Sequence, residues 1–164
     1  MFRKMRRFKQ ELSAAEAREI LEKGSYGVLA CAGDDGYPYA VPVNYVLDGQ
    51  NIYFHCAMEG HKIDALRRCE KVSFCVVGRD QVVPEELTTY FVSAIAFGRA
   101  RFVEDAEEKH AALMRLGLKY EPGMEDHVRE HVDGSFARTA LVAIEIEHLS
   151  GKEAIELTRQ RNKS

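Results

Sequence analysis

Short β-prone segments separated by tight turns fill the first half of the chain and constrain its fold most strongly. Apolar and β-branched residues run through 26–32, and the turn sequence Gly33-Asp34-Asp35-Gly36 follows. A second such segment, 39–47, ends at Asp48-Gly49, and a third covers 51–56. Asp-Gly between two β-prone runs is a strong hairpin signal. These three segments therefore predict an antiparallel meander.

The rest of the chain alternates strand and helix patterns. Ser13 and Glu16 form a capping-box pattern before an apolar helical stripe that ends near Gly24. Further helices are expected at 61–69, 105–118 and 121–132, and further strands at 72–77, 88–103 and 140–146. Gly98 is expected to mark a bulge, 81–87 a loop and 150–152 a turn.

About six antiparallel strands with helices at their edges favour a small barrel. Closure of such a sheet removes the exposed edges that an open meander presents. The length of 164 residues fits one domain. We therefore expect a mainly β single domain over 1–164, with a basic N-terminal arm at 1–12 and a polar tail at 155–164.

Charge is distributed unevenly along the chain. The net charge is −3, yet five cations lie in the first nine residues: Arg3, Lys4, Arg6, Arg7 and Lys9. The other residues carry −8, since 18 cations face 26 acids. An acidic body argues against a nucleic-acid groove, which needs basic surface. The arm is either solvated, as short charged termini usually are, or contacts an anion.

Neither a membrane nor an oxidising compartment is indicated. No apolar run approaches the ~20 residues of a membrane span, and no secretory leader is recognisable. The four cysteines, Cys31, Cys56, Cys69 and Cys75, contain no C-x-x-C pair. Reduced cysteines are typical of the cytoplasm, so we expect a cytoplasmic protein.

One motif suggests metal chemistry. His127-Val128-Arg129-Glu130-His131 fits the H-x-x-E-H pattern, and a spacing of four places both imidazoles on one helix face. Catalytic zinc needs a third protein ligand, yet only 33 residues follow His131 and they begin with an expected strand. We therefore expect no metal site here.

The segment from Tyr53 to Lys62 favours an anion site. An expected strand ends near Cys56, and Gly60 permits a tight turn before a helix that begins with His61 and Lys62. A helix N-terminus offers free amides and positive dipole charge, and a lysine adds a full charge. A phosphate fits this arrangement best, and a solvated lysine on the first turn is the alternative.

Several motifs follow one another along nearly the whole chain. They are Met1-Phe2-Arg3 with Met5-Arg6-Arg7, Asp35-Gly36-Tyr37-Pro38-Tyr39-Ala40-Val41-Pro42, Tyr53-Phe54-His55 with Gly60-His61-Lys62, Val82-Val83-Pro84-Glu85-Glu86, Tyr90 with Ser93 and Gly98, and Ser150-Gly151-Lys152-Glu153-Ala154. In this order the chain resembles the FMN-binding split-barrel superfamily of pyridoxamine 5′-phosphate oxidase. Its nitroimidazole-resistance (Nim-type) branch is the most similar.

The resemblance implies a six-stranded antiparallel split β-barrel with flanking helices. It also implies a homodimer that binds FMN without covalent attachment, with the flavin at the subunit interface. Carried over position by position, His61 and Lys62 match the basic pair that holds the FMN phosphate. Phe54, His55 and Cys56 match the strand along the ribityl chain and the ring.

Other positions carry over from neighbouring strands. Val43 and Asn44 match a strand whose backbone and side chain meet the edge of the isoalloxazine. Ser93 matches a polar position near the flavin, and Lys152 follows a turn that approaches the partner's cofactor in relatives. The oxidase branch carries an arginine and a lysine on the strand that includes 41–46, and neither is present here. Oxidation of pyridoxamine phosphate is therefore not expected.

The resemblance implies an FMN-dependent oxidoreductase that reduces a small acceptor such as a nitro-aromatic. The sequence does not name the electron donor, and the cleft of such a dimer could admit reduced nicotinamide in this role. His55 matches a histidine beside the flavin, and an imidazole that titrates near neutrality can supply a proton. His55 is thus the candidate catalytic residue, with a structural histidine as the alternative. A flavin- or haem-binding carrier or sensor without turnover is the second function, because a shared fold does not determine function.

Overall fold

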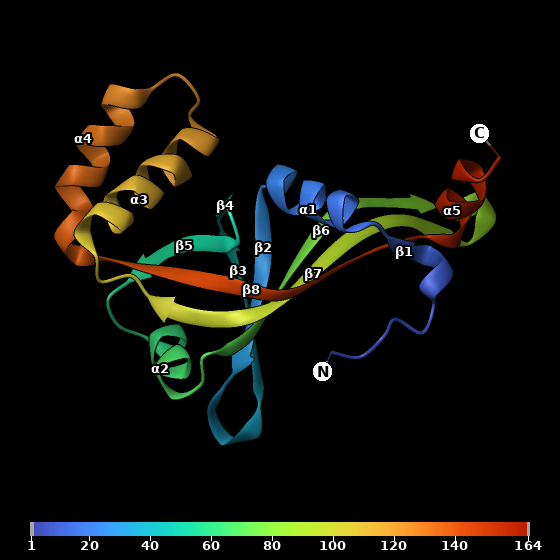
Figure 1. Cartoon of the computed structure of the whole chain (residues 1–164), viewed down its shortest axis with the longest axis horizontal. Helices are drawn as coiled ribbons and strands as arrows, with labels where there is room; N and C mark the ends of the chain where they lie inside the picture. Colours follow the sequence, from blue (N-terminus) through green and yellow to red (C-terminus); the bar gives the residue numbers. More distant parts are fainter. Residues whose placement is uncertain (1, 164) are drawn as a thin grey trace.

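The computed structural model describes residues 2–163, in which one curled antiparallel sheet carries helices on its outside (Figure 1). The strands are β1 (Glu11–Leu12), β2 (Tyr26–Ala32), β3 (Pro38–Asn44), β4 (Val46–Asp48), β5 (Asn51–Ala57), β6 (Lys71–Val83), β7 (Thr88–Phe102) and β8 (Thr139–Glu153). The helices are α1 (Ala14–Lys23), α2 (His61–Arg68), α3 (Ala106–Tyr120), α4 (Glu125–Ser135) and α5 (Ile155–Arg161). No helix within residues 2–163 is long and apolar enough to span a bilayer.

The sheet curls back on itself but stays split along one seam. Its strand order is β3-β2-β6-β7-β8-β5-β4, with β1 paired to β8. The two ends of this order, β3 and β4, are neighbours in the chain, separated only by Tyr45. No ladder joins β3 to β4 or β5 among the described residues, so the closed barrel expected from the strand pattern is wrong, and the split barrel is confirmed.

Tyr45 explains why the expected strand at 39–47 is two strands. Its side chain is 0% exposed, and its hydroxyl donates a hydrogen bond to the carbonyl of Leu21. Its ring meets the buried Phe74 edge-on at 4.9 Å between centroids. Burial of this residue between β3 and β4 interrupts the ladder. With this division and β1, the described residues form an eight-stranded sheet instead of the six strands expected.

Three long strands extend beyond the barrel, where the sequence predicted loops. The expected loop at 81–87 is strand β6 as far as Val83, and the expected turn at 150–152 lies inside β8. Val83 pairs with Thr88, and Lys152 pairs with both Ser93 and Glu11. These long-range ladders override weak local strand propensity. The expected bulge at Gly98 is confirmed by a register shift between Phe97 and Gly98.

Two helices pack close to the long strands. The capping box of α1 is confirmed, since Ser13 Oγ accepts from the Glu16 amide and Glu16 Oε2 accepts from the Ser13 amide. Ala17 of α1 lies so close to β8 that a Cβ at Gly151 would meet its Cβ at 2.9 Å. The polar tail expected at 155–164 forms α5 as far as Arg161, and Ser164 lies outside the described residues.

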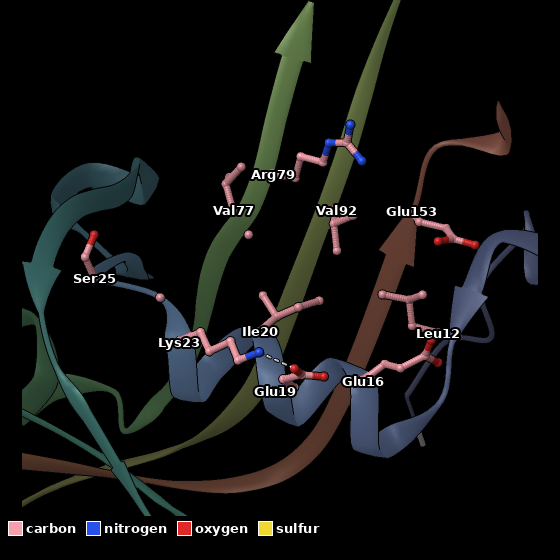
Figure 2. A pocket seen from close by; sticks show the side chains of 12 residues that line it. Leu12, Glu16, Glu19, Ile20, Lys23, Ser25, Val77, Arg79, Val92 and Glu153 are labelled. Atoms are coloured by element: carbon pink, nitrogen blue, oxygen red, sulfur yellow. Dashed lines mark hydrogen bonds and ion pairs between the residues drawn. The ribbon is translucent and has the colours of Figure 1, made fainter. Parts of the chain in front are cut away.

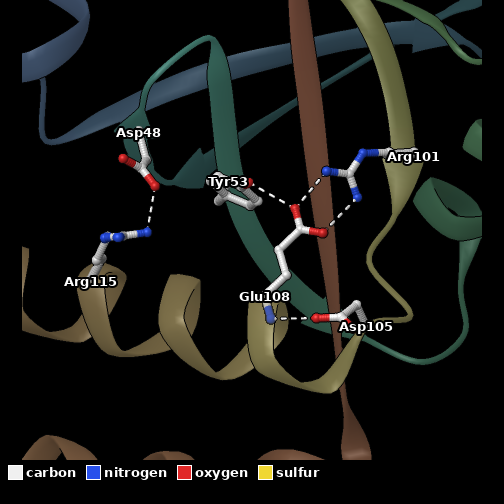
Figure 3. A network of polar contacts seen from close by, with 6 residues as sticks. All are labelled: Asp48, Tyr53, Arg101, Asp105, Glu108 and Arg115. Carbon is white, nitrogen blue, oxygen red and sulfur yellow. Dashed lines mark hydrogen bonds and ion pairs between the residues drawn. The ribbon is translucent and has the colours of Figure 1, made fainter.

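Helices α3 and α4 form a hairpin at the end of the sheet opposite α5 (Figure 1). Asp105 caps α3 by accepting from the Glu108 amide at 2.7 Å. Glu108 then accepts from both terminal nitrogens of Arg101 on β7 and from the Tyr53 hydroxyl on β5 (Figure 3). Helix α4 begins later than expected because Gly123, at φ 82°, turns the chain first.

A substitution at Gly27 measures how tightly the barrel core is packed. A Cβ at this position would lie 2.2 Å from Cε1 of Phe74, which is fully buried. We expect Gly27→Ala to lower the free energy of unfolding by about 1–3 kcal/mol, as overpacking does. Urea denaturation measures this loss. The control is Gly134→Ala in α4, where nothing lies within 4 Å and alanine should stabilise the helix by up to ~1 kcal/mol. Equal effects would contradict the packing argument.

Candidate functional site

Helix α2 begins where the sequence analysis places the anion site. Gly60 precedes it with φ 122°, a conformation open to glycine and rare for other residues. Ile63 and Leu66 are buried in the core, which orients the first turn toward the surface. No side chain caps the N-terminus of α2 within the described residues. The first-turn amides therefore present positive dipole charge to this side of the barrel.

The two basic residues of this turn point in different directions. Lys62 is partly buried, and its Nζ lies 5.6 Å from the ring centroid of Phe54. His61 is exposed, its Nε2 lies 3.4 Å from Asp34 Oδ2, and its ring lies 4.2 Å from that of Tyr39. Arg68 binds the same Asp34 carboxylate at 2.5 Å. Lys62 thus faces the predicted cofactor strand, whereas His61 contacts a carboxylate.

Asn44 and His55 come together at a cavity of about 610 Å³. The cavity lies between α3, α4 and the seam of the barrel. One side is apolar, formed by Leu113, Leu116, Val128 and Val132. The polar side chains that line it come from β3, β5, α3, α4, β8 and the segments that follow α3 and α4: Asn44, His55, Tyr120, Glu121, His127, His131, Ser135, Arg138 and Thr139. The structure therefore brings two predicted site residues into one cavity.

His55 is held as a neutral imidazole. Burial lowers its pKa below the usual 6.5, and the positive charge of Lys62 and the neighbouring His131 lower the pKa further. Burial raises the pKa of the adjacent Cys56 thiol, which keeps it protonated. At neutral pH, β5 therefore presents an uncharged imidazole, which can donate and accept hydrogen bonds, near the positive charge of Lys62.

The other residues of the two predicted strands contribute differently. Phe54 is 0% exposed in the core, and its ring lies beneath the Lys62 ammonium. Val43 is partly buried and packs against the same core. Asn44 donates through Nδ2 to the Ser25 carbonyl at 3.0 Å, which fixes its side chain at the seam.

Ser93 and Lys152 lie far from the other predicted residues of the same chain. They pair across β7 and β8, and the Lys152 Nζ lies 5.3 Å from the Phe91 ring centroid. Phe54 pairs with Val142 of β8, ten residues before Lys152. At ~3.3 Å per residue this separation is about 30 Å along the strand. One chain alone therefore does not bring both groups to one ligand.

Sequence reasoning missed the contacts that hold α3 against the seam. Lys119 Nζ donates to the carbonyls of Gly24 at 2.7 Å and Tyr45 at 2.9 Å. The Tyr120 hydroxyl donates to the Ser25 carbonyl and accepts from the Tyr45 amide at 3.2 Å. Burial lowers the pKa of Lys119. The sequence carries no local signal for these contacts, because their acceptors are backbone carbonyls about 75 to 95 residues away.

The H-x-x-E-H histidines both line the cavity, as their spacing on one helix face predicts. His127 Nδ1 lies 2.9 Å from Glu121 Oε2. Within residues 2–163, no group of three or more His, Cys, Asp or Glu side chains is arranged to hold a metal ion.

A second cavity, of about 520 Å³, lies between α1 and strands β6 and β7 (Figure 2). Ile20, Val77 and Val92 form its apolar lining. Its charged groups bind other residues: Lys23 binds Glu19, and Arg161 lies 2.8 Å from both Glu16 and Glu153. None of the predicted site residues lines it.

The pKa of His55 can be measured directly. We expect an NMR titration of the protein without added ligand to give a pKa below 6.5, because burial and positive charge disfavour the imidazolium. Lys62→Met should raise this pKa, yet leave it below 6.5 because burial remains. Lys71→Met, on the exposed start of β6, is the control and should leave it unchanged. An unchanged His55 pKa in Lys62→Met would mean that Lys62 has no electrostatic influence there.

Solved structures with the same fold come from several bacteria. A FAD-binding protein from Mesorhizobium loti is 29% identical, with 88% of this chain and 96% of that chain covered and a TM-score of 0.61. A candidate 5-nitroimidazole antibiotic resistance protein from Bacteroides thetaiotaomicron is 22% identical, with 87% and 86% covered and a TM-score of 0.71. A FAD- and haem-binding protein from Mycobacterium smegmatis is 21% identical, with 88% and 73% covered and a TM-score of 0.76. At these last two identities the likeness concerns the fold alone.

The match to a protein family extends over most of the chain. No curated protein matches the sequence. Residues 13–153 match the family described as pyridoxamine 5′-phosphate oxidase, a span that includes every predicted site residue from Val43 to Lys152. The chain therefore belongs to the pyridoxamine 5′-phosphate oxidase family.

Proposed function

We propose that this protein is an FMN-binding oxidoreductase that reduces a small acceptor such as a nitro-aromatic compound. The observation that carries the proposal is that Asn44 and His55 line one cavity, while Lys62 lies over Phe54 of the same strand as His55 and lowers the His55 pKa. Family membership and the FAD-binding relative from Mesorhizobium loti support a flavin. The four free cysteines suit a reducing cytoplasm, where we place the protein.

The residues at the start of α2 fit a flavin phosphate. Gly60 brings the backbone close without a side chain, and a Cβ there would meet nothing within 4 Å. The uncapped first-turn amides and the Lys62 ammonium supply donors and positive charge. His61 would add a third contact after giving up part of its contact with Asp34. These groups would hold the phosphate of FMN.

The seam and the cavity fit the ring and the acceptor. When bound there, a flavin supplies the two-electron redox chemistry that the side chains lack. The Asn44 amide and the backbone of β5 beside His55 would orient the ring edge. His55 would face the acceptor in the cavity and supply a proton as the acceptor is reduced. Because its pKa is lowered, this proton supply should favour acidic pH.

A homodimer would bring the two distant groups of residues together. Ser93 and Lys152 of one subunit would approach the flavin held by α2 of the other. Ile95 and Phe97, on the same face of β7 as Ser93, are more than one third exposed. Burial of these side chains against a second copy would contribute to association.

A haem-binding carrier or sensor is the second candidate. His55, His127 and His131 line one cavity, and imidazole is a common axial ligand of haem iron. The structural neighbour from Mycobacterium smegmatis, described as binding FAD and haem, supports this second candidate. Pyridoxamine phosphate oxidation is not proposed, because 41–46 lacks the arginine and lysine of the oxidase branch.

Absorption spectra and turnover separate the two candidates. We expect the purified protein, after addition of FMN, to show flavin bands near ~370 and ~450 nm and to reduce a nitro-aromatic with reduced nicotinamide. His55→Gln should retain the flavin bands and lose activity most at acidic pH. A Soret band without nitro reduction would favour the haem carrier instead.

Lys62→Ala tests the phosphate site. Hydrogen bonds to charged groups contribute ~1.5–3 kcal/mol, so FMN binding should weaken roughly ten- to a hundredfold. Flavin fluorescence quenching measures this affinity. Riboflavin, which lacks the phosphate, is the control, and its weaker affinity should hardly change. Equal losses for both ligands, or no loss, would remove Lys62 from the phosphate site.

Light scattering tests the dimer. The FMN-loaded protein at micromolar concentration should have twice the chain mass of 18.6 kDa. Stable interfaces usually bury about 1,200–2,000 Å², and a cofactor between subunits links its binding to association. Removal of FMN should therefore promote dissociation. A monomer that retains its full flavin content would contradict this assembly.

A further inference from the structure

The basic N-terminal arm takes no part in the site described above, yet the structure fixes its course. The Gln10 side chain is 3% exposed and donates through Nε2 to the Glu153 carbonyl at 2.8 Å. Glu11 then pairs with Lys152. At the other end of the arm, the Phe2 ring stacks on His148 at 4.7 Å and 9° and lies 5.5 Å from Phe97. The arm is therefore held at both ends on β8.

The arm lies on the face of the sheet that carries Lys152. His148, Ser150 and Lys152 alternate along β8 and so share one face. They pair with Phe97, Ile95 and Ser93 of β7, which share the same face. Helix α1 packs on the opposite face, where it contacts Gly151. Between Gln10 and Phe2, the arm thus runs from the end of β8 back to His148, on the face of the sheet that carries Lys152.

Three cations of this arm have no ion-pair partner among the residues that the structure describes. Arg3, Lys4 and Arg6 are exposed, and within residues 2–163 none of them pairs with a carboxylate. Arg7 contacts the neutral Gln10 side chain at 3.5 Å. The rest of the chain carries −8 and offers many carboxylates. Exposed cations without ion-pair partners, close together in the sequence of an otherwise acidic protein, are suited to an anionic ligand.

We propose that Arg3, Lys4 and Arg6 bind the diphosphate of a nicotinamide dinucleotide, the electron donor. This inference rests on the proposed function, in which Lys152 of one subunit approaches the flavin ring bound to the other. The phosphate of FMN already has its own site at α2. The arm, whose Phe2 end lies on the same face of β8 as Lys152, would then meet a second phosphate-bearing ligand that extends away from the ring.

The decisive experiment is calorimetric titration of the FMN-loaded protein with NAD⁺ and NADP⁺, which do not reduce the flavin. Exposed ion pairs contribute ~0.2–1 kcal/mol each, so Arg3→Gln with Arg6→Gln should weaken binding about two- to thirtyfold. Added salt should weaken wild-type binding more than variant binding. The comparison of the two dinucleotides shows whether the additional phosphate of NADP⁺ also meets the arm.

Matched variants show whether a loss of affinity comes from the arm itself or from the loss of positive charge anywhere on the surface. Lys71→Gln with Arg129→Gln removes two exposed cations away from the arm and should leave the affinity within about twofold. Phe2→Ala frees the end of the arm without a change in charge and should also weaken binding, whereas Phe2→Tyr retains the stacking and should restore it. Nicotinamide mononucleotide, which lacks the diphosphate, should bind equally to wild type and to the arm variant.

Three outcomes would overturn the proposal. Equal dinucleotide affinity in wild type and arm variant would exclude the arm as the site. Absence of dinucleotide binding to wild-type protein that binds FMN would also overturn it, and nitro reduction by the chemically reduced protein would then leave the proposed function intact. Tighter binding of a single-stranded oligonucleotide, lost in the arm variant, would assign the cations to nucleic acid. Failure of wild-type protein to bind FMN would instead contradict the proposed function.

Discussion

Burial of Tyr45 at the seam of the barrel is the constraint on which the site depends. Its hydroxyl reaches the Leu21 carbonyl, and its backbone carbonyl accepts from Lys119. Because the residue turns into the core, β3 ends at Asn44 and β4 begins on the other edge of the sheet. The barrel therefore stays open at this point, and Asn44 and His55 face the cavity under α3 and α4.

Charge is organised around this seam. The N-terminus of α2 and Lys62 place positive charge on one side of β5, while His55 stays neutral because burial and Lys62 lower its pKa. Glu108 ties α3 to β5 and β7 through Tyr53 and Arg101. This contact holds the helices that form the far wall of the cavity. The packing of α3 thus determines which side chains a ligand would meet beside β5.

Local sequence patterns predicted those elements that depend mainly on residues close together in the chain. The capping box of Ser13, the helix that follows Gly60 and the bulge at Gly98 all lie where the sequence indicates them. Strand β6 beyond Val77 and the end of β8 were not predictable in this way. Each becomes a strand because a distant segment supplies its hydrogen bonds, and the turn residues around Pro84 and Gly151 obscure that pairing.

The sequence by itself determined the glycine and lysine at the start of α2 and the two helical histidines at a spacing of four, and the resemblance to a known family added the histidine of β5. The type of each side chain and its spacing from its neighbours along the chain can be read directly from the sequence. Only the tertiary structure decided which of them meet, since curling of the sheet brings His55, Asn44 and α4 to one cavity. It also placed Ser93 and Lys152 about 30 Å away along β8, because strand length and register depend on pairing between residues far apart in the chain.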